Sequence, residues 1–363
     1  MFRYCSGKMA VITVAINGFG RIGRMVYRAG YQDKQLNIVA VNDLTDTKTL
    51  AHLLKYDSVH GTFPEEISYT KDSLIVGKKR IKVLAERDPG RLPWKQLKVD
   101  VVVESTGFFL TRELASLHLK AGARKVLLSA DAKSSDIKTL INGVNEKNYD
   151  KVKDQIVSNA SCTSNCTAPL VKVLNDALAV ENALFTTTHA YTASQKLQDA
   201  PDKNLRTARA AAVNIIPHSS GAATAVPLTI PAMQGRFDGL ALRVPVIDGS
   251  ITVLTAWVKK KTTVGEVNLS FKRASESQLK GLLEYSTKPL VSSDIIGNQH
   301  SCIFDSEFTK VSGQLVQVLG WYDNEWGYSC RMVDMIKLIG ADLGAVVEEE
   351  KVKVKGKGKK TGR

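Results

Sequence analysis

Short apolar runs alternate with helical patterns along the first half of the chain. Residues 10–16 (AVITVAI), 37–41 (NIVAV), 100–103 (DVVV) and 125–128 (KVLL) are rich in β-branched side chains, which is typical of buried strands. Residues 21–31 follow the first run with helical periodicity. Strands that alternate with helices predict right-handed crossovers and a parallel sheet covered on both faces, so we expect a doubly wound α/β fold here.

The pattern changes after about residue 160. Helical patterns are expected at 264–275 and 276–285, and a final apolar helix near 331–339. Residues 190–217 form a long, polar, irregular stretch, and a loop of that length in a compact protein is usually functional. Longer β-rich runs appear at 183–188, 239–244, 250–258 and 315–321. These runs predict an α+β domain with a largely antiparallel sheet.

This change in pattern predicts the domain organisation. We expect a first domain over residues 1–160, in which residues 1–9 form an extension, and a second domain over residues 161–328. A C-terminal helix within 329–347 is expected to return to the first domain. Residues 348–363 are expected to form a basic, disordered tail, because this segment is of low complexity.

The net charge is concentrated at the two ends of the chain. The 363 residues include 50 Lys and Arg against 36 Asp and Glu, a net charge of +14. Residues 1–9 and 351–363 hold nine of the basic residues and no acidic ones; without those nine, 41 basic residues face 36 acidic ones, a net charge of +5. Nucleic acid is therefore not expected as the main partner.

Composition excludes several other classes. A hydrophobic content of 44% and a charged content of 24% are typical of a globular chain and exclude a collagen or a disordered protein. The longest uncharged stretch, residues 210–235, contains three prolines and several polar residues, so no membrane association is expected. No signal segment precedes the five cysteines, which predicts reduced thiols and a cytoplasmic protein.

A glycine-rich turn follows the first predicted strand. Gly18, Gly20 and Gly23 form a G-x-G-x-x-G pattern that opens a predicted helix, and Asp43 ends the next strand. Gly18 permits a tight turn, Gly20 lets the backbone approach a pyrophosphate, and Gly23 lets helix and strand pack closely. Asp43 would bind the ribose hydroxyls and repel a 2′-phosphate. The pattern predicts a Rossmann-type domain that binds NAD rather than NADP; the alternative is a glycine-rich turn without a ligand.

Residues 158–166 (SNASCTSNC) contain the candidate nucleophile. Cys162 lies just before an amphipathic helical pattern, and a helix N-terminus stabilises a thiolate. Pro169 leaves the start of that helix open, and from the residues alone Cys162 or Cys166 could be structural. Among six histidines, His189 closes a β-rich run and opens the long loop, which suits an acid–base group. His218 remains undecided, and structural roles are expected for His52, His60, His118 and His300.

A series of sequence segments, in a fixed order along the chain, resembles a known family. The ordered segments are NGFGRIGR, VND, ERDPG, VVESTG, SNASCTSNC, TTTHAYTASQ, NIIPHSSGAA, LALRVPV and WYDNEWGYS, over roughly residues 10–345. They resemble the phosphorylating glyceraldehyde-3-phosphate dehydrogenases, glycolytic and gluconeogenic enzymes. The resemblance implies that Cys162 attacks the aldehyde to give a thiohemiacetal and that His189 takes the proton. Hydride transfer to NAD would then leave a thioester, which inorganic phosphate converts to 1,3-bisphosphoglycerate.

The resemblance also implies the remaining site residues and a homotetramer. No metal is expected, because the C-x₃-C spacing of Cys162 and Cys166 matches no common zinc arrangement. Substrate phosphate is expected near Thr192, Ser194 and Arg243. The attacking phosphate is expected among Ser161, Thr163, Ser220 and Gly221. Asn324 would orient the nicotinamide carboxamide, and the cofactor groove would be lined by Arg21, Ile22, Leu44, Arg87, Thr106 and Ser129.

Four positions depart from the usual family pattern without removing a catalytic group. Asp131 stands where proline is common, Ser220 replaces threonine, Thr224 replaces lysine and Cys330 replaces asparagine. We expect Asp131 to weaken anion or cofactor binding if its side chain faces the groove. Two alternative functions remain open: an erythrose-4-phosphate dehydrogenase, and a nucleic-acid-binding or surface-binding role of the basic tail.

Overall fold

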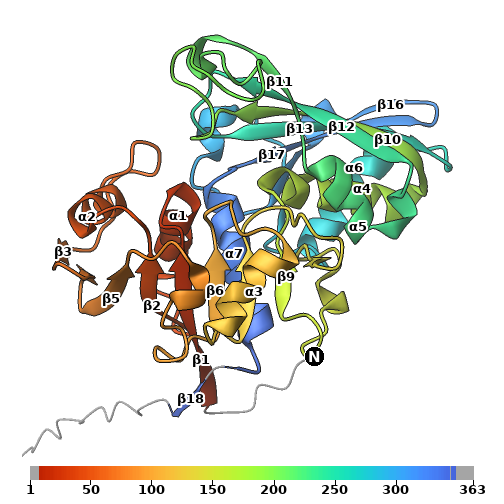
Figure 1. Cartoon of the computed structure of the whole chain (residues 1–363). Coiled ribbons are helices and arrows are strands. Elements are labelled where there is room, and N and C mark those ends of the chain that lie inside the picture. The colour runs from red at the N-terminus through yellow and green to blue at the C-terminus, as the bar shows by residue number, and fades with distance from the viewer. Residues whose placement is uncertain (1–7, 344, 349–363) are drawn as a thin grey trace, which may run out of the picture.

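Two β-sheets, each covered by helices, make up the chain (Figure 1). This computed structural model describes residues 8–343 and 345–348. Residues 1–7 of the expected extension and 349–363 of the expected tail lie outside the described residues, whereas Lys8, Met9 and Glu348 belong to strands, so the extension and the tail are shorter than expected. Within the described residues, no helix has the length and apolar character needed to cross a membrane.

The first sheet is the predicted doubly wound sheet. Its strand order is β3-β4-β5-β2-β1-β6-β7-β9-β8, and β18 pairs with β1 at one end. The pairs from β5 through β8 are parallel, whereas β3, β4 and β18 join antiparallel. The strands are β1 (Lys8–Asn17), β2 (Leu36–Asn42), β3 (Ile67–Tyr69), β4 (Ser73–Val76), β5 (Lys79–Leu84), β6 (Val101–Glu104), β7 (Lys125–Leu128), β8 (Lys138–Thr139), β9 (Ile156–Ser158) and β18 (Ala345–Glu348).

The second sheet is largely antiparallel, as expected. Its order is β11-β12-β10-β13-β17-β15-β14, with β16 paired to β17, and only β10·β12 and β14·β15 are parallel. The strands are β10 (Val180–Ala190), β11 (Ile216–Ser219), β12 (Phe237–Val244), β13 (Ser250–Val258), β14 (Leu283–Ser286), β15 (Cys302–Asp305), β16 (Lys310–Ser312) and β17 (Leu315–Tyr322).

Helices connect and cover the sheets. α1 and α7 pack against each other, and their buried residues join the core of the first sheet. α4, α5 and α6 cover the second sheet on the side that faces the first sheet (Figure 1). The helices are α1 (Arg21–Gly30), α2 (Thr47–Lys55), α3 (Arg112–Lys120), α4 (Cys162–Leu178), α5 (Ala222–Thr229), α6 (Val264–Glu276) and α7 (Trp326–Gly340).

One predicted helix is wrong. Residues 276–285 do not form a second helix after α6. The chain turns instead through Gly281, whose φ of +78° is a left-handed conformation that glycine adopts without strain. Leu283–Ser286 then forms β14, which pairs in parallel with β15. The apolar side chains that indicated a helix are buried by this sheet pairing, which a local pattern does not reveal.

Candidate active site

The carboxyl ends of the parallel strands bring the predicted groups to one edge of the first sheet. β1 leads into Gly18, β2 into Asp43, and β6 into Thr106. β7 leads into Ser129, and β9 leads through three residues into Cys162. In open parallel sheets this edge is where ligands bind, so the topology explains why segments far apart in sequence contribute to one site.

The glycine turn has the geometry that phosphate binding requires. Gly18 has a φ of +89°, and a Cβ there would lie 2.7 Å from the backbone nitrogen of Thr106. A Cβ on Gly23 would lie 2.1 Å from the carbonyl oxygen of Gly18. By contrast, none of the described atoms lies within 4 Å of a Cβ placed on Gly20, the N-cap of α1. The backbone is therefore open to a ligand at Gly20, where the N-terminus of α1 favours an anion.

Asp43 closes this turn and lines an adjacent cavity. Its carboxylate accepts hydrogen bonds from the backbone N–H groups of Phe19 (2.9 Å) and Thr45 (3.0 Å). The cavity has a volume of about 450 Å³, and its other lining residues include Gly18, Gly20, Leu44, Arg87 and Thr106. The carboxylate of Asp43 fits the ribose hydroxyls of a dinucleotide, and the open backbone at Gly20 fits its phosphates.

Three of the residues predicted for the cofactor groove do not line this cavity: Arg21, Ile22 and Ser129. The guanidinium of Arg21 binds the carboxylates of Asp57 and Glu325 instead. Ile22 packs partly buried against the core of the first sheet. The backbone N–H of Ser129 donates to the carbonyl oxygen of Glu104.

Cys162 is the first residue of α4, so the helix starts earlier than Pro169, which lies inside it. Ser161 is the N-cap, and its hydroxyl accepts a hydrogen bond from the backbone N–H of Ser164 at 3.2 Å. Ala160 has a φ of +53° that turns the chain from β9 into the helix. Cys162 therefore lies beside the unpaired N–H groups of a helix N-terminus, whereas Cys166 is fully buried in the core.

His189 lies beside Cys162 and Arg243. The Nε2 atom of His189 is 3.4 Å from the Sγ atom of Cys162. β10 and β12 pair in parallel with His189 opposite Arg243, which brings one guanidinium nitrogen to 2.6 Å from His189 Nδ1. That nitrogen also donates to the carbonyl oxygen of Ala190 at 3.1 Å, and His189 Nδ1 lies 2.6 Å from the same oxygen. Nδ1 either donates to the Ala190 carbonyl oxygen or accepts from the Arg243 guanidinium, and the first of these tautomers leaves Nε2 free to accept a proton from the thiol.

Burial and the charge of Arg243 set the proton affinities. Burial raises the pKa of Cys162 to about 11, and the positive charge of Arg243 opposes this rise. Burial lowers the pKa of His189 to about 3, and Arg243 lowers it further by repelling a charged ring. The ligand-free pair is therefore a neutral thiol and a neutral imidazole. The charge of Arg243 stabilises a thiolate on Cys162 and destabilises an imidazolium on His189.

A buried tyrosine links α4 to the second sheet. The Tyr322 hydroxyl is 2.9 Å from Thr163 Oγ1 and 2.7 Å from Thr187 Oγ1. Thr163, predicted to bind phosphate, therefore already has a partner through its hydroxyl. Tyr322 was not among the predicted site residues, because only the register of β13 and β17 brings it here.

Asn324 is held by Ser250, the first residue of β13. Its Oδ1 atom accepts a hydrogen bond from the Ser250 hydroxyl at 2.6 Å, and the Ser250 hydroxyl accepts one from the backbone N–H of Ala190 at 3.1 Å. Ser250 thereby links the amide of Asn324 to the end of β10, the strand that carries His189. With Oδ1 engaged, its NH₂ group remains available to a ligand carbonyl.

Four of the residues predicted for the two anion sites form two groups. Thr192 and Ser194 follow β10, with their hydroxyls 2.9 Å apart. Gly221 is the N-cap of α5, and the Ser220 hydroxyl accepts a 3.4 Å hydrogen bond from the backbone N–H of Ala222. Asp131 faces this second group, because a Cβ on Gly221 would lie only 1.8 Å from its Oδ2 atom.

His60, Asp248 and Asp323 bring their potential ligand atoms within 4.8 Å of one another. The carboxylate of Asp323 already accepts hydrogen bonds from the backbone N–H groups of Gly297, Glu325 and Trp326. Burial, together with the charge of Asp323, raises the pKa of Asp248 to about 9. A neutral Asp248 is a poor metal ligand, and of its two oxygens Oδ1 accepts from the backbone N–H of Gly249, while Oδ2 is buried without a hydrogen-bond partner among the described residues.

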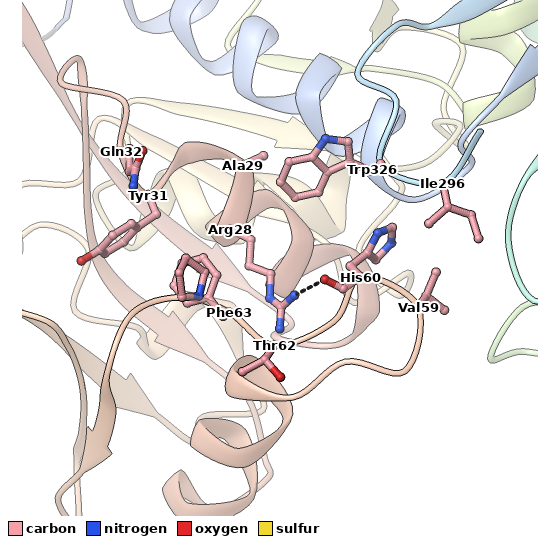
Figure 2. Close-up of a pocket in the computed structure, with 12 residues that line it drawn as sticks. Arg28, Ala29, Tyr31, Gln32, Val59, His60, Thr62, Phe63, Ile296 and Trp326 are labelled. Atoms are coloured by element: carbon pink, nitrogen blue, oxygen red, sulfur yellow. Dashed lines mark hydrogen bonds between the residues drawn. The ribbon is translucent and has the colours of Figure 1, made fainter. Parts of the chain in front are cut away.

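A second cavity is larger than the one beside Asp43, and Cys162 is not among its lining residues (Figure 2). It has a volume of about 640 Å³, and its aromatic lining comes from Tyr31 just after α1, from the loop after α2 and from Trp326 of α7. Arg28 points into it, but its guanidinium donates to the carbonyl oxygens of Leu54 and Gly61 and stands 5.3 Å from the centre of the Phe63 ring. Within the part of the chain described, no cysteine, serine or carboxylate lines this cavity, and the imidazole of its His60 lies 3.1 Å from the Glu325 carboxylate.

Comparisons with known proteins agree on one family. A family model described as glyceraldehyde 3-phosphate dehydrogenase, NAD binding domain, matches residues 12–112, and one described as the C-terminal domain matches residues 161–324. The chain is 53% identical over 333 residues to glyceraldehyde-3-phosphate dehydrogenase 2 of Streptomyces arenae, covering 92% of this chain and 99% of that protein. It is 52% identical over 339 residues to the glyceraldehyde-3-phosphate dehydrogenase of Mycobacterium avium, with the same two coverages.

Proposed function

The chain belongs to the glyceraldehyde-3-phosphate dehydrogenase family, and we propose that Cys162 and His189 carry out its reaction. The resemblance deduced from the sequence motifs is confirmed, and with it an NAD-dependent oxidoreductase of the glycolytic class. The observation that supports the proposal best is the 3.4 Å contact between Cys162 Sγ and His189 Nε2 at the N-terminus of α4. Covalent catalysis needs a nucleophile within reach of a base, and the base must itself be held in place. Here the base is His189, whose Nδ1 atom contacts Ala190 and Arg243.

We propose that the thiol attacks the aldehyde carbon while His189 Nε2 accepts the thiol proton. The thiohemiacetal oxygen would then lie near the backbone N–H of Cys162 and the imidazolium, both of which stabilise its negative charge. Arg243 would bind the substrate phosphate through its guanidinium, with Thr192 and Ser194 as further donors. Because phosphate neutralises Arg243, substrate binding itself would raise the proton affinity of His189.

When bound, NAD would supply a hydride acceptor for the thiohemiacetal. Gly18, Gly20 and Gly23 would admit its pyrophosphate to the N-terminus of α1, and Asp43 would hold the ribose hydroxyls and exclude a 2′-phosphate. Leu44, Arg87 and Thr106 line the same cavity. Asn324 would orient the carboxamide through the NH₂ group that Ser250 leaves free.

The thioester on Cys162 would be released by inorganic phosphate. We propose that phosphate reaches it among Ser161, Thr163, Ser220 and Gly221, where α4 and α5 both begin. Two helix N-termini stabilise an anion, and the neighbouring hydroxyls would fix its orientation. The product would be 1,3-bisphosphoglycerate.

We further propose a cytoplasmic homotetramer. Support comes from exposed apolar side chains on the outer face of the second sheet, where Leu184, Leu240, Trp257 and Leu315 remain 65, 44, 46 and 40% exposed. An apolar sheet face of this kind is typical of a subunit interface. Sedimentation of the purified chain tests the assembly.

The catalytic proposal is tested by following NADH absorbance with glyceraldehyde 3-phosphate, with and without inorganic phosphate. We expect Cys162→Ser to lose activity by a factor of about 10⁴ or more, because the nucleophile is removed. Cys330→Ser is the matched control, since Cys330 lies on α7 and has no role in the proposed steps. Full activity in Cys162→Ser would refute the mechanism. Erythrose 4-phosphate in place of the substrate tests the alternative specificity.

A further inference from the structure

Asp131 lies where a negative charge is least expected. It follows β7, and its carboxylate occupies the space that a Cβ on Gly221 would need, 1.8 Å from Oδ2. Its Oδ1 atom is fully buried and has no hydrogen-bond partner among the described residues. Burial raises the pKa of Asp131 above the usual carboxyl range. The carboxyl group therefore contributes no hydrogen bond that would explain its position as structural support.

The Asp131 loop is fixed relative to the nucleophile. The Ser158 hydroxyl donates to the carbonyl oxygen of Ala130 at 2.7 Å and accepts a hydrogen bond from the backbone N–H of Ala160 at 3.0 Å. One serine therefore holds both the residue before Asp131 and the turn that leads to Cys162. The charge of Asp131 reaches the thiol, because it is among the groups that raise the pKa of Cys162.

The position of Asp131 conflicts with phosphate binding. Gly221 belongs to the group of residues, with Ser161, Thr163 and Ser220, at which we propose that phosphate attacks. Phosphate beside Asp131 brings two negative charges together unless the carboxyl group takes up a proton. Either event lowers the affinity for phosphate relative to the same site without the carboxyl group. Water carries no charge and has no such cost.

We propose that Asp131 is a specificity-determining residue that disfavours phosphate and thereby lets water compete for the acyl group on Cys162. This inference rests on the proposed thioester mechanism. In the competing reaction, water oxygen bonds to the thioester carbon and the carbon–sulfur bond breaks. One water proton ends on the Cys162 sulfur, and the other is released when the product acid, 3-phosphoglycerate, ionises. The chain thus has a second, hydrolytic product.

Asp131→Asn tests this inference, because the amide keeps the volume and removes the charge. We expect the KM for phosphate to fall about fivefold or more, while the KM values for glyceraldehyde 3-phosphate and NAD change less than about twofold. A structural role of Asp131 would instead change all three constants or the melting temperature. Asp136→Asn is the matched control, since Asp136 lies on the same loop but is exposed and paired with Arg112.

Product analysis gives a second readout. NADH measures total oxidation, and ATP formed by a kinase that uses the acyl phosphate measures the phosphorylated product. In the unmodified enzyme at low phosphate we expect NADH to exceed ATP, and in Asp131→Asn we expect this excess to fall about fivefold. If Asp131→Asn misfolds by circular dichroism, Asp131→Ala replaces it.

Two failures can be told apart. Equal phosphate KM values and equal product ratios in the unmodified enzyme and Asp131→Asn, with NADH formation still dependent on Cys162, would overturn the role of Asp131 alone. NADH formation that does not depend on Cys162 would overturn the thioester mechanism itself.

Discussion

His189 touches a positive charge on one side and the nucleophile on the other. Arg243 lies 2.6 Å from Nδ1 and disfavours protonation of the ring, whereas the proposed mechanism requires Nε2 to accept a proton. In the proposed mechanism, a bound substrate phosphate would resolve this conflict by neutralising Arg243. Binding energy from a part of the substrate that does not react would thus be used in the chemical step.

This arrangement predicts the behaviour of a substrate without phosphate. With glyceraldehyde, kcat should fall about tenfold or more in addition to the expected rise in KM, because Arg243 stays unpaired and keeps the proton affinity of His189 low. Steady-state NADH formation at saturating aldehyde measures this. Inorganic phosphate is held saturating in both series as the control. An unchanged kcat with only a higher KM would contradict the coupling.

The proton affinity of Cys162 predicts the pH dependence of alkylation. Because burial raises the thiol pKa to about 11, the reactive thiolate fraction of the ligand-free enzyme should grow with pH from 7 to 10 without a plateau. The rate of inactivation by iodoacetamide measures it. Arg243→Gln should react about threefold or more slowly at pH 8, because it loses the charge that favours the thiolate. A plateau between pH 6 and 8 would contradict this prediction.

Among the elements, α4 has a cap that serves both folding and chemistry. Ser161→Ala removes the hydroxyl that caps the helix and should lower the free energy of unfolding by about 1 kcal/mol, and it should also raise the KM for phosphate. Thr263→Ala is the matched control, because Thr263 caps α6 through a capping box away from the site. It should lose similar stability and keep its kinetics. Chemical denaturation and initial rates provide the two measurements.

Elements with a strong local pattern could be predicted from the sequence. Residues 125–128 and 250–258 coincide with β7 and β13, because each is an apolar run that the core of a sheet buries. The hairpin of β4 and β5 was not predicted, because its Lys79 and Arg80 are exposed and do not indicate a strand. The helix expected over 276–285 is wrong, because pairing of β14 with β15 overrides a local helical pattern.

The same limit applies to the site. Motifs were sufficient to select Cys162 and His189 as candidates for one site. The contact of Arg243 with His189 was not foreseen, because it depends on the register of β10 against β12. The position of Asp131 against Gly221 depends on how two loops from different sheets meet. The sequence therefore predicted an effect of Asp131 only for the case that its side chain faces the groove.

At the scale of the whole molecule, we expect enzyme activity not to require the charge of the C-terminal segment. Removal of residues 351–363 takes the net charge from +14 to +7 and leaves every residue of the proposed site in place. We expect kcat and the KM for NAD to change less than about twofold. Binding to a polyanion such as heparin, followed across a salt series, should become weaker and less salt-dependent. A large loss of activity would contradict this expectation.

The first and last described strands lie in one ladder. In β1 and β18, Lys8 pairs with Glu348 and Val11 with Ala345, so the two ends of the folded chain run side by side in opposite directions (Figure 1). A short linker can therefore join them with little loss of loop entropy. The molecule is thus suited to circular permutation: new ends opened in an exposed turn, such as that at Gly313 between β16 and β17, would leave both sheets and the Cys162 site intact.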